Sequence, residues 1–221
     1  MEKSSKIDMN NIAEVRNSLE TKSLKVCIVG IGRIGLPTAL SFAEAGLQTI
    51  GADINEELVD SINAGKFPLK DEPGYEDIFN SVRKNGNFSA TTDINDAISK
   101  SNLILLSLPT PMDKNNIPTY LALESVGKQL SKHLQSNSLV VVESTIEPGF
   151  IEDVMIKRME IDSRLQVGKN FTIGVCPENA NPGEILHDFT SLPRLVGGID
   201  EQTTKIIALI YDFVFSVELV T

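Results

Sequence analysis

The stretch LKVCIVGIGRIGLPTALSFAEAG, residues 24–46, predicts how the chain folds. It begins with a compact β-rich apolar run that ends at Gly30, continues as the pattern G-x-G-x-x-G, and closes as a helix that ends at Gly46. A glycine-rich turn between a strand and a helix is the first unit of a dinucleotide-binding βαβ fold. A lone match to this pattern would be weak, so the sequence around it has to agree.

Each glycine of the turn has a separate physical role. Gly30 permits the tight turn, Gly32 lets the backbone approach a pyrophosphate, and Gly35 lets helix and strand pack closely. A pyrophosphate would then face the N-terminus of the helix, where unpaired N–H groups favour it. The alternative is a turn that uses its glycines only for packing. Arg33 lies inside the turn, where it could cover the pyrophosphate or be solvated.

Asp53 ends the second apolar run, 18 residues after Gly35. An acidic residue at this place in a dinucleotide-binding unit accepts hydrogen bonds from the ribose hydroxyl groups. The same carboxylate would repel a 2′-phosphate. We therefore predict that the cofactor is NAD and not NADP.

From residue 24 onward, short apolar runs alternate with longer amphipathic ones. Strands are predicted at 24–30, 47–53, 87–92, 101–109, 137–145, 170–177, 194–198 and 216–221, and helices at 35–46, 55–65, 73–86, 93–100, 119–134, 147–160 and 200–214. Asn55 and Gly65 are the expected caps of the second of these helices. Alternation of this kind predicts an α/β fold with a doubly wound, Rossmann-type parallel sheet. Such a sheet binds its ligand at the carboxyl ends of its strands.

The composition excludes several other classes of protein. The chain has 221 residues and a formal net charge of -10, with no run of lysine or arginine, so we expect neither nucleic acid nor a membrane as partner. No apolar stretch reaches the roughly 18 residues of a membrane span. His133 and His187 are isolated, so no metal site is expected. The polar N-terminus and the lack of a disulfide framework fit a cytoplasmic protein.

Hydroxyl groups follow two of the strongest predicted strands. In SLPTPMD, residues 107–113, two prolines stiffen the loop around Thr110. In ESTIEPGF, residues 143–150, Ser144 and Thr145 stand at the end of the strand. These hydroxyl groups could contact cofactor or substrate. A rigid connection in the first segment and turn capping in the second are the structural alternatives.

The segment GVCPENANPGE, residues 174–184, follows the next strand. Cys176 has no neighbouring histidine, lysine or arginine to lower the pKa of its thiol, so it is interpreted as a small buried hydrophobe, like Cys27. Glu178 stands where a ligand should lie and keeps a functional interpretation.

These segments together resemble the UDP-sugar 6-dehydrogenase family, in particular its UDP-N-acetylmannosamine branch. The resemblance covers roughly residues 24–221 and is carried by GIGRIGLPTALSFAEAG (30–46), GADIN (51–55), INAGKFPLKDEPG (62–74), LPTPMD (108–113), ESTIEPG (143–149) and CPENANPGEILHDFTSLPRLVGG (176–198).

The resemblance implies a chemistry. Members oxidise the 6-hydroxyl group of a UDP-sugar to a carboxylate with two NAD, through an aldehyde, a cysteine thiohemiacetal and a thioester that water hydrolyses. It implies catalytic roles for Glu178, in acid–base or water-activating work, and for Thr145, near the reacting carbon. The expected cofactor contacts are Gly30, Gly32, Arg33, Ile34, Gly35, Asp53, Pro109, Thr110 and Thr145.

Two departures from the family pattern stand out. Asn179 occupies a position where the acetamido-sugar branch is expected to have arginine, so the fixed charge and fork geometry of a guanidinium are lost. The helix, the nucleophilic cysteine segment and the UDP-sugar domain that would follow residue 221 are not in this sequence. We therefore expect a 1–23 extension, with a short helix or a partly ordered tail, and an NAD domain at 24–221 that is inactive alone.

Three other functions stay open at this stage. The whole enzyme could act on UDP-glucose, the chain could be a stand-alone dinucleotide-binding module, or it could belong to another hydroxyacid or hydroxyacyl dehydrogenase. The resemblance implies a homodimer for the whole enzyme, formed through the absent helix. It leaves the assembly of this chain open.

Overall fold

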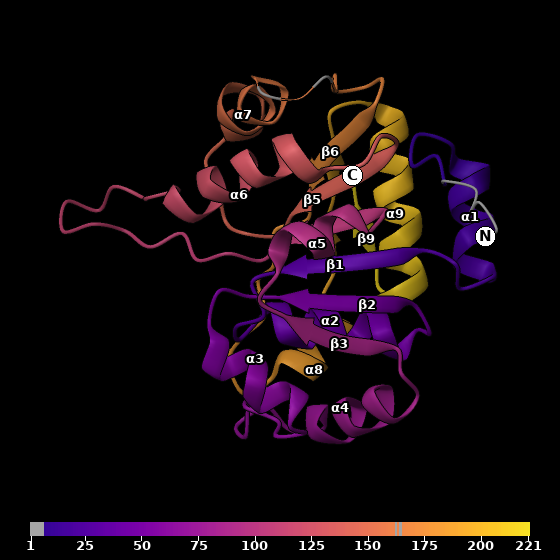
Figure 1. The fold of residues 1–221 in the computed structure, drawn as a ribbon, viewed down its shortest axis with the longest axis vertical. Helices are drawn as coiled ribbons and strands as arrows, with labels where there is room; N and C mark the ends of the chain where they lie inside the picture. The colour runs from indigo at the N-terminus through magenta and orange to yellow at the C-terminus, as the bar shows by residue number, and fades with distance from the viewer. Residues whose placement is uncertain (1–6, 162, 164) are drawn as a thin grey trace.

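The fold is a seven-stranded sheet with helices on both faces, seen in a computed structural model that describes residues 7–161, 163 and 165–221 (Figure 1). The strands lie in the order β3 (Phe88–Thr91), β2 (Gln48–Ala52), β1 (Lys25–Val29), β4 (Leu103–Leu106), β5 (Ser138–Val142), β6 (Phe171–Val175) and β8 (Gly197–Gly198). All neighbouring strands are parallel except β8, which runs antiparallel to β6. The doubly wound α/β prediction is confirmed, and the edge strand β8 departs from it.

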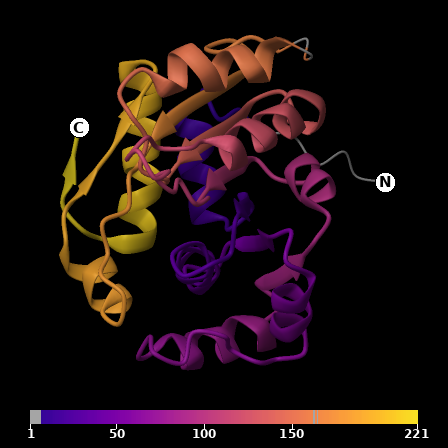
Figure 2. The ribbon, with the colours of Figure 1, turned by 90° about the vertical axis from the view of Figure 1, so that its left-hand side faces the viewer.

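The helices divide between the two faces of the sheet. One face is covered by α1 (Ile12–Glu20), α2 (Gly35–Glu44), α3 (Glu56–Asn63), α4 (Tyr75–Lys84), α8 (Ile185–Ser191) and α9 (Glu201–Phe215). The other is covered by α5 (Ile94–Ser99), α6 (Leu121–His133), the π-helical turn η1 (Ile151–Met155) and α7 (Ile156–Ile161). In Figure 2, the yellow helix α9 lies on the opposite side of the sheet from α6 and α7.

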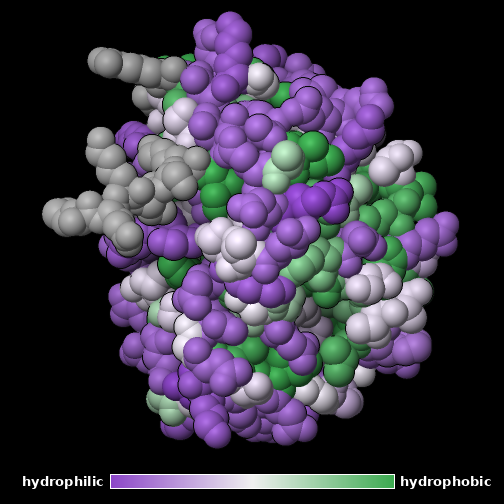
Figure 3. All heavy atoms as spheres, turned by 90° about the vertical axis from the view of Figure 1, so that its right-hand side faces the viewer, coloured by the Kyte–Doolittle hydropathy of each residue, from purple (hydrophilic) through white to green (hydrophobic). Residues whose placement is uncertain are grey.

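Each central strand supplies two separate cores. Val26 and Ile28 of β1 are buried in the core beneath α2 and α9, whereas Cys27 and Val29 are buried in the core beneath α5 and α6. Successive side chains of a strand point to opposite faces, so a strand covered on both sides needs an unbroken apolar run. The outer surface in Figure 3 is mostly hydrophilic, with smaller apolar patches between the polar groups.

Local capping agrees with the sequence. Asn55 accepts a hydrogen bond from the backbone N–H of Leu58 at 3.1 Å, as its predicted N-cap position requires. Gly65 follows the same helix with a φ of +85°, a conformation that favours glycine. Among the described residues, none of the helices has both the length and the apolar character that crossing a bilayer requires.

The C-terminal part of the fold differs from the predicted pattern. The single strand predicted at 194–198 is two strands, because β7 (Arg194–Leu195) pairs with β9 (Leu219–Val220) while β8 turns away to pair with β6. Helix α8 was absent from the prediction. Its short sequence has weak helix propensity, and it is held instead by the burial of Ile185 and Phe189.

Candidate functional site

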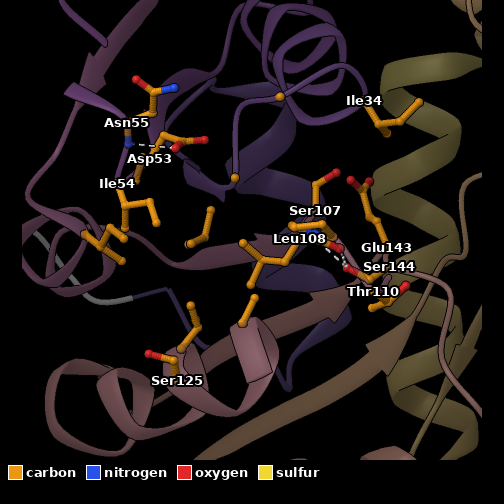
Figure 4. A pocket seen from close by; sticks show the side chains of 18 of the residues that line it. Ile34, Asp53, Ile54, Asn55, Ser107, Leu108, Thr110, Ser125, Glu143 and Ser144 are labelled. Carbon is orange, nitrogen blue, oxygen red and sulfur yellow. Dashed lines mark hydrogen bonds between the residues drawn. The ribbon is translucent and has the colours of Figure 1, made fainter. Parts of the chain in front are cut away.

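A cavity of about 670 Å³ opens at the carboxyl ends of the strands (Figure 4). This is a size typical of a ligand site, and the position is where parallel α/β sheets bind ligands. The structure brings together in its wall nearly all of the site residues predicted from sequence: Gly30, Gly32, Arg33, Ile34, Asp53, Pro109, Thr110, Thr145 and Glu178. Gly35 lies directly behind this wall.

The three glycines of the turn meet different surroundings. Gly30 has a φ of +88°, and a Cβ atom there would come within 2.5 Å of the Ser107 carbonyl oxygen. A Cβ atom at Gly35 would come within 1.8 Å of the Gly30 carbonyl oxygen. A Cβ atom at Gly32 would meet nothing within 4 Å and would occupy the cavity. Gly30 and Gly35 therefore serve the fold, whereas Gly32 keeps the cavity open.

The N-terminus of α2 suits an anionic ligand. Its N-cap residue Ile34 makes no side-chain capping bond, and its first turn holds no acidic residue. The first N–H groups of a helix have no partner within the helix, and the helix dipole favours negative charge there. A diphosphate placed against Gly32 would meet these donors, so the residues present fit a dinucleotide.

Asp53 is held in place by the backbone. Its Oδ2 accepts the N–H of Ile31 and its Oδ1 accepts the N–H of Asn55, both at 2.9 Å. A carboxylate has about four acceptor sites, so two remain for a ligand. The half-buried side chain also lines the cavity, as Figure 4 shows.

Arg33 is bound to the segment between α3 and α4. Its Nη2 pairs with Asp71 at 2.7 Å and its Nη1 pairs with Glu72 at 2.8 Å. The hydrogen bond from Arg33 lowers the pKa of Asp71. The sequence left open whether this guanidinium is solvated or covers a pyrophosphate. In the structure it is instead paired with the two acidic residues.

Ser144 fastens the loop after β4 to the end of β5. Its hydroxyl group donates to the carbonyl oxygen of Leu108 at 2.7 Å and accepts the N–H of Leu108 at 2.9 Å (Figure 4). Thr145 is exposed and Thr110 is half-buried, and both line the cavity. Of the two neighbouring hydroxyl groups, Ser144 makes the structural contact and Thr145 stays on the cavity side.

Glu178 is held on both oxygens. Its Oε1 accepts the N–H groups of Asn179 at 2.9 Å and Ala180 at 3.1 Å, and its Oε2 pairs with Arg194. The two paired side chains are only 6% and 3% exposed. The Glu178 carboxyl group is therefore fixed in position by one ion pair and two backbone N–H groups.

The sequence analysis gave no role to Arg194, which stands in the middle of an apolar segment. Its guanidinium lies 4.0 Å from the ring centre of Phe215 and 4.5 Å from that of Phe189. The sequence signal was a lone charge in an apolar segment, because its acidic partner is 16 residues away and the aromatic rings come from other segments. The expectation that Cys176 has no neighbouring arginine is wrong, because Arg194 lies beside it and lowers the pKa of its thiol. Burial outweighs this effect and raises that pKa to about 12.

Glu143 is a second buried carboxyl group that the sequence analysis did not single out. The hydroxyl group of Tyr211 donates to its Oε1 at 2.7 Å, and its Oε2 has no hydrogen-bond partner among the described residues. Burial is the main cause that raises its pKa to about 7, and the charge of Glu178 adds to it. The carboxyl group lies beside Ser107 in Figure 4, at the wall of the cavity.

Comparison with known proteins places the chain in a family of NAD-binding domains. The model of the UDP-glucose/GDP-mannose dehydrogenase family, NAD binding domain, matches residues 24–214. Protein CapL of Staphylococcus aureus is 32% identical over 86% of this chain, and the UDP-N-acetyl-D-mannosamine dehydrogenase of Campylobacter jejuni is 31% identical over 85%. The crystal structure of a ternary complex of GDP-mannose dehydrogenase from Pseudomonas aeruginosa matches 88% of the chain with a TM-score of 0.83 and 28% identity.

The matched region covers most of this chain but less than half of each relative. The chain spans 43% of CapL, 46% of the Campylobacter jejuni enzyme and 45% of the Pseudomonas aeruginosa chain. What these proteins share with the chain is therefore the region that folds as the NAD-binding domain.

Alanine at Gly32 and at Gly35 should separate binding from folding. We expect Gly35→Ala to lower the free energy of unfolding by at least about 3 kcal/mol, because its methyl group overlaps a backbone oxygen. Gly32→Ala should leave unfolding within about 0.5 kcal/mol and weaken NAD binding about tenfold or more, since its methyl group takes space from the ligand. Chemical denaturation and calorimetric titration measure both. Equal NAD affinity in Gly32→Ala and wild type would contradict the placement of the diphosphate.

Glu143→Gln should change how stability depends on pH. The folded state holds the Glu143 proton more tightly than the unfolded state, so this group lowers the free energy of unfolding as pH rises from about 4.5 to about 7. Glutamine does not titrate, so its free energy of unfolding does not fall in this way. Between pH 4.5 and 8, the free energy of unfolding of the variant should therefore rise relative to that of wild type by up to about 3 kcal/mol. Denaturant unfolding at several pH values measures it, with exposed Glu147→Gln as the control. If the free energies of unfolding of Glu143→Gln and wild type changed in parallel with pH, burial would not raise the pKa of Glu143.

Proposed function

Because the chain belongs to the UDP-glucose/GDP-mannose dehydrogenase family as its NAD binding domain, we propose that it is the cofactor-binding part of an enzyme that oxidises the 6-hydroxyl group of a nucleotide sugar. The observation that carries this proposal is the cavity itself. It joins an uncapped helix N-terminus, an open Gly32 and the carboxylate of Asp53 at one sheet edge.

Residues of this chain divide the work of binding. NAD supplies a hydride acceptor when it is bound. The backbone from Gly32 to Gly35 holds the diphosphate, and the remaining acceptor sites of Asp53 hold ribose hydroxyl groups. Pro109 and Thr110 then border the part of the cavity at the ends of β4 and β5. Ser144 keeps this border rigid through its two bonds to Leu108.

Two side chains stand where the reacting carbon of a substrate would approach. Thr145 presents an exposed hydroxyl group that can orient a substrate or a water molecule. Glu178 lines the cavity, and Arg194 and two backbone N–H groups hold its carboxyl group in place. A positioned carboxyl group can accept a hydrogen bond or a proton, so the proposed role of Glu178 is that of a base or a water-orienting group.

The substrate that we favour is UDP-N-acetyl-D-mannosamine, oxidised to its uronate with two NAD. UDP-N-acetyl-D-mannosamine dehydrogenases are among the relatives, as is a GDP-mannose 6-dehydrogenase. UDP-glucose is the alternative substrate. We also propose that residues 24–221 form the NAD domain, that 1–23 are an extension, and that the whole enzyme is a homodimer with its thiol nucleophile outside this sequence.

Cofactor selectivity tests the role of Asp53. Calorimetric titration of the chain should show NAD binding and NADP binding at least about tenfold weaker, since the carboxylate repels a 2′-phosphate. Asp53→Asn should reduce the difference between the two affinities. It should weaken NAD binding, because a hydrogen-bond acceptor is lost, and strengthen NADP binding, because the repulsion of the 2′-phosphate is removed. The neighbouring Asn55→Ala provides a control that leaves the charge in place. Equal affinity of wild type for the two cofactors would refute the assignment.

Turnover tests the division between cofactor domain and whole enzyme. The 221-residue chain should bind NAD but should not form the two NADH per sugar that oxidation to the uronate gives with UDP-N-acetylmannosamine, UDP-glucose or GDP-mannose. The second oxidation needs a thiol that captures the aldehyde, and neither of the two cysteines of the chain is a reactive thiol. Absorbance at the NADH band is the measurement. Formation of two NADH per sugar by this chain alone would place the nucleophile inside it and overturn the proposal.

A further inference from the structure

Glu72 has a buried carboxyl group that accepts three hydrogen bonds from two other segments. Its side chain is only 1% exposed. It accepts hydrogen bonds from Arg33 Nη1 at 2.8 Å, from the backbone N–H of Gly183 at 2.8 Å and from that of Ile185 at 3.3 Å. The three donors belong to the glycine-rich turn and to the start of α8, so one side chain joins two parts of the molecule that are far apart in sequence.

These two parts serve opposite sides of the proposed site. Arg33 lies within the turn that holds the diphosphate. Gly183 and Ile185 end the segment that begins with Glu178, and Asn181 in that segment is bonded to Asp188 of α8. Glu72 is therefore the direct connection between the cofactor turn and the segment that carries the proposed catalytic carboxylate.

The neighbouring Asp71 binds the same guanidinium in a different setting. Its side chain is 60% exposed, and within the described part of the chain no backbone N–H group of another segment donates to it. An exposed ion pair contributes little, so Arg33 can exchange Asp71 for a ligand oxygen at small cost. Separating Arg33 from Glu72 would instead leave a buried charge without its cation, which is strongly unfavourable.

We propose that Glu72 is a positioning residue that transmits cofactor binding from the glycine-rich turn to the segment 178–185. The inference rests on the proposed NAD site. A diphosphate bound at the turn restrains Arg33, Arg33 restrains the Glu72 carboxylate, and the carboxylate restrains the N–H groups of Gly183 and Ile185. Occupancy by cofactor then makes local opening of the segment behind Glu178 less frequent.

Glu72→Gln and Asp71→Asn form a matched pair, because each removes one negative charge beside Arg33. We expect Glu72→Gln to weaken NAD binding about tenfold, since a charge-assisted hydrogen bond is lost and an amide N–H group replaces an acceptor. Asp71→Asn should change NAD affinity by less than about twofold. Calorimetric titration measures both, and thermal unfolding of each variant reports whether the fold is kept.

Hydrogen exchange gives a result that simple destabilisation cannot imitate. In wild type and in Asp71→Asn, saturating NAD should slow exchange of the Gly183 and Ile185 amides several-fold, with little change in α9 as the internal reference. In Glu72→Gln this slowing should disappear at NAD concentrations that still saturate the variant. If Glu72→Gln does not fold, the same hydrogen-exchange measurement is made on Glu72→Asp and compared with that on wild type.

The outcomes separate this inference from the function beneath it. If wild type does not bind NAD, the proposed function fails. If wild type binds NAD but the Gly183 and Ile185 amides exchange at the same rate with and without it, the coupling through Glu72 is refuted while the cofactor site stands. Equal NAD affinities in Glu72→Gln and Asp71→Asn would also refute it.

Discussion

The close approach of α2 to the end of β1 is the constraint on which the rest of the site depends. A Cβ atom at Gly35 would lie 1.8 Å from the Gly30 carbonyl oxygen, so only glycine allows the helix to begin there. This contact places the uncapped N-terminus of α2 over the cavity. It also places Arg33, at the base of the turn, within reach of Asp71 and Glu72. The position of the α2 N-terminus and the ion pairs of Arg33 thus both depend on the lack of a side chain at Gly35.

Three carboxyl groups with buried side chains bind neighbouring segments through different partners: Glu143 and Glu178 line the cavity, and Glu72 binds Arg33 of its wall. Glu178 is paired with Arg194, whereas Glu143 has one neutral donor, Tyr211, and a raised pKa. Glu72 is paired with a half-exposed guanidinium and two backbone N–H groups. Of the three, Glu143 is the one without a salt bridge among the described residues, and desolvation raises its pKa. Three chemically identical side chains thereby make different contacts.

Most of the fold could be predicted because its signals are local. Unbroken apolar runs, glycine stops and the cap at Asn55 mark the parallel strands and the helices between them. The prediction lost accuracy after residue 184, where α8 depends on buried Ile185 and Phe189 and not on helix propensity. Likewise, residues 194–198 form two strands because β7 pairs with β9 and β8 pairs with β6, and neither pairing can be read from the local sequence.

By itself, the sequence determined the doubly wound sheet, the glycine-rich turn and the acidic residue at the second strand end, because each depends on residues close together in the chain. Only the tertiary structure decided which charges meet. Arg33 finds Glu72 39 positions away, and Tyr211 finds Glu143 68 positions away. Such pairs are fixed by how helices pack on the sheet, and burial then sets their charge. No periodicity or motif in the chain carries that information.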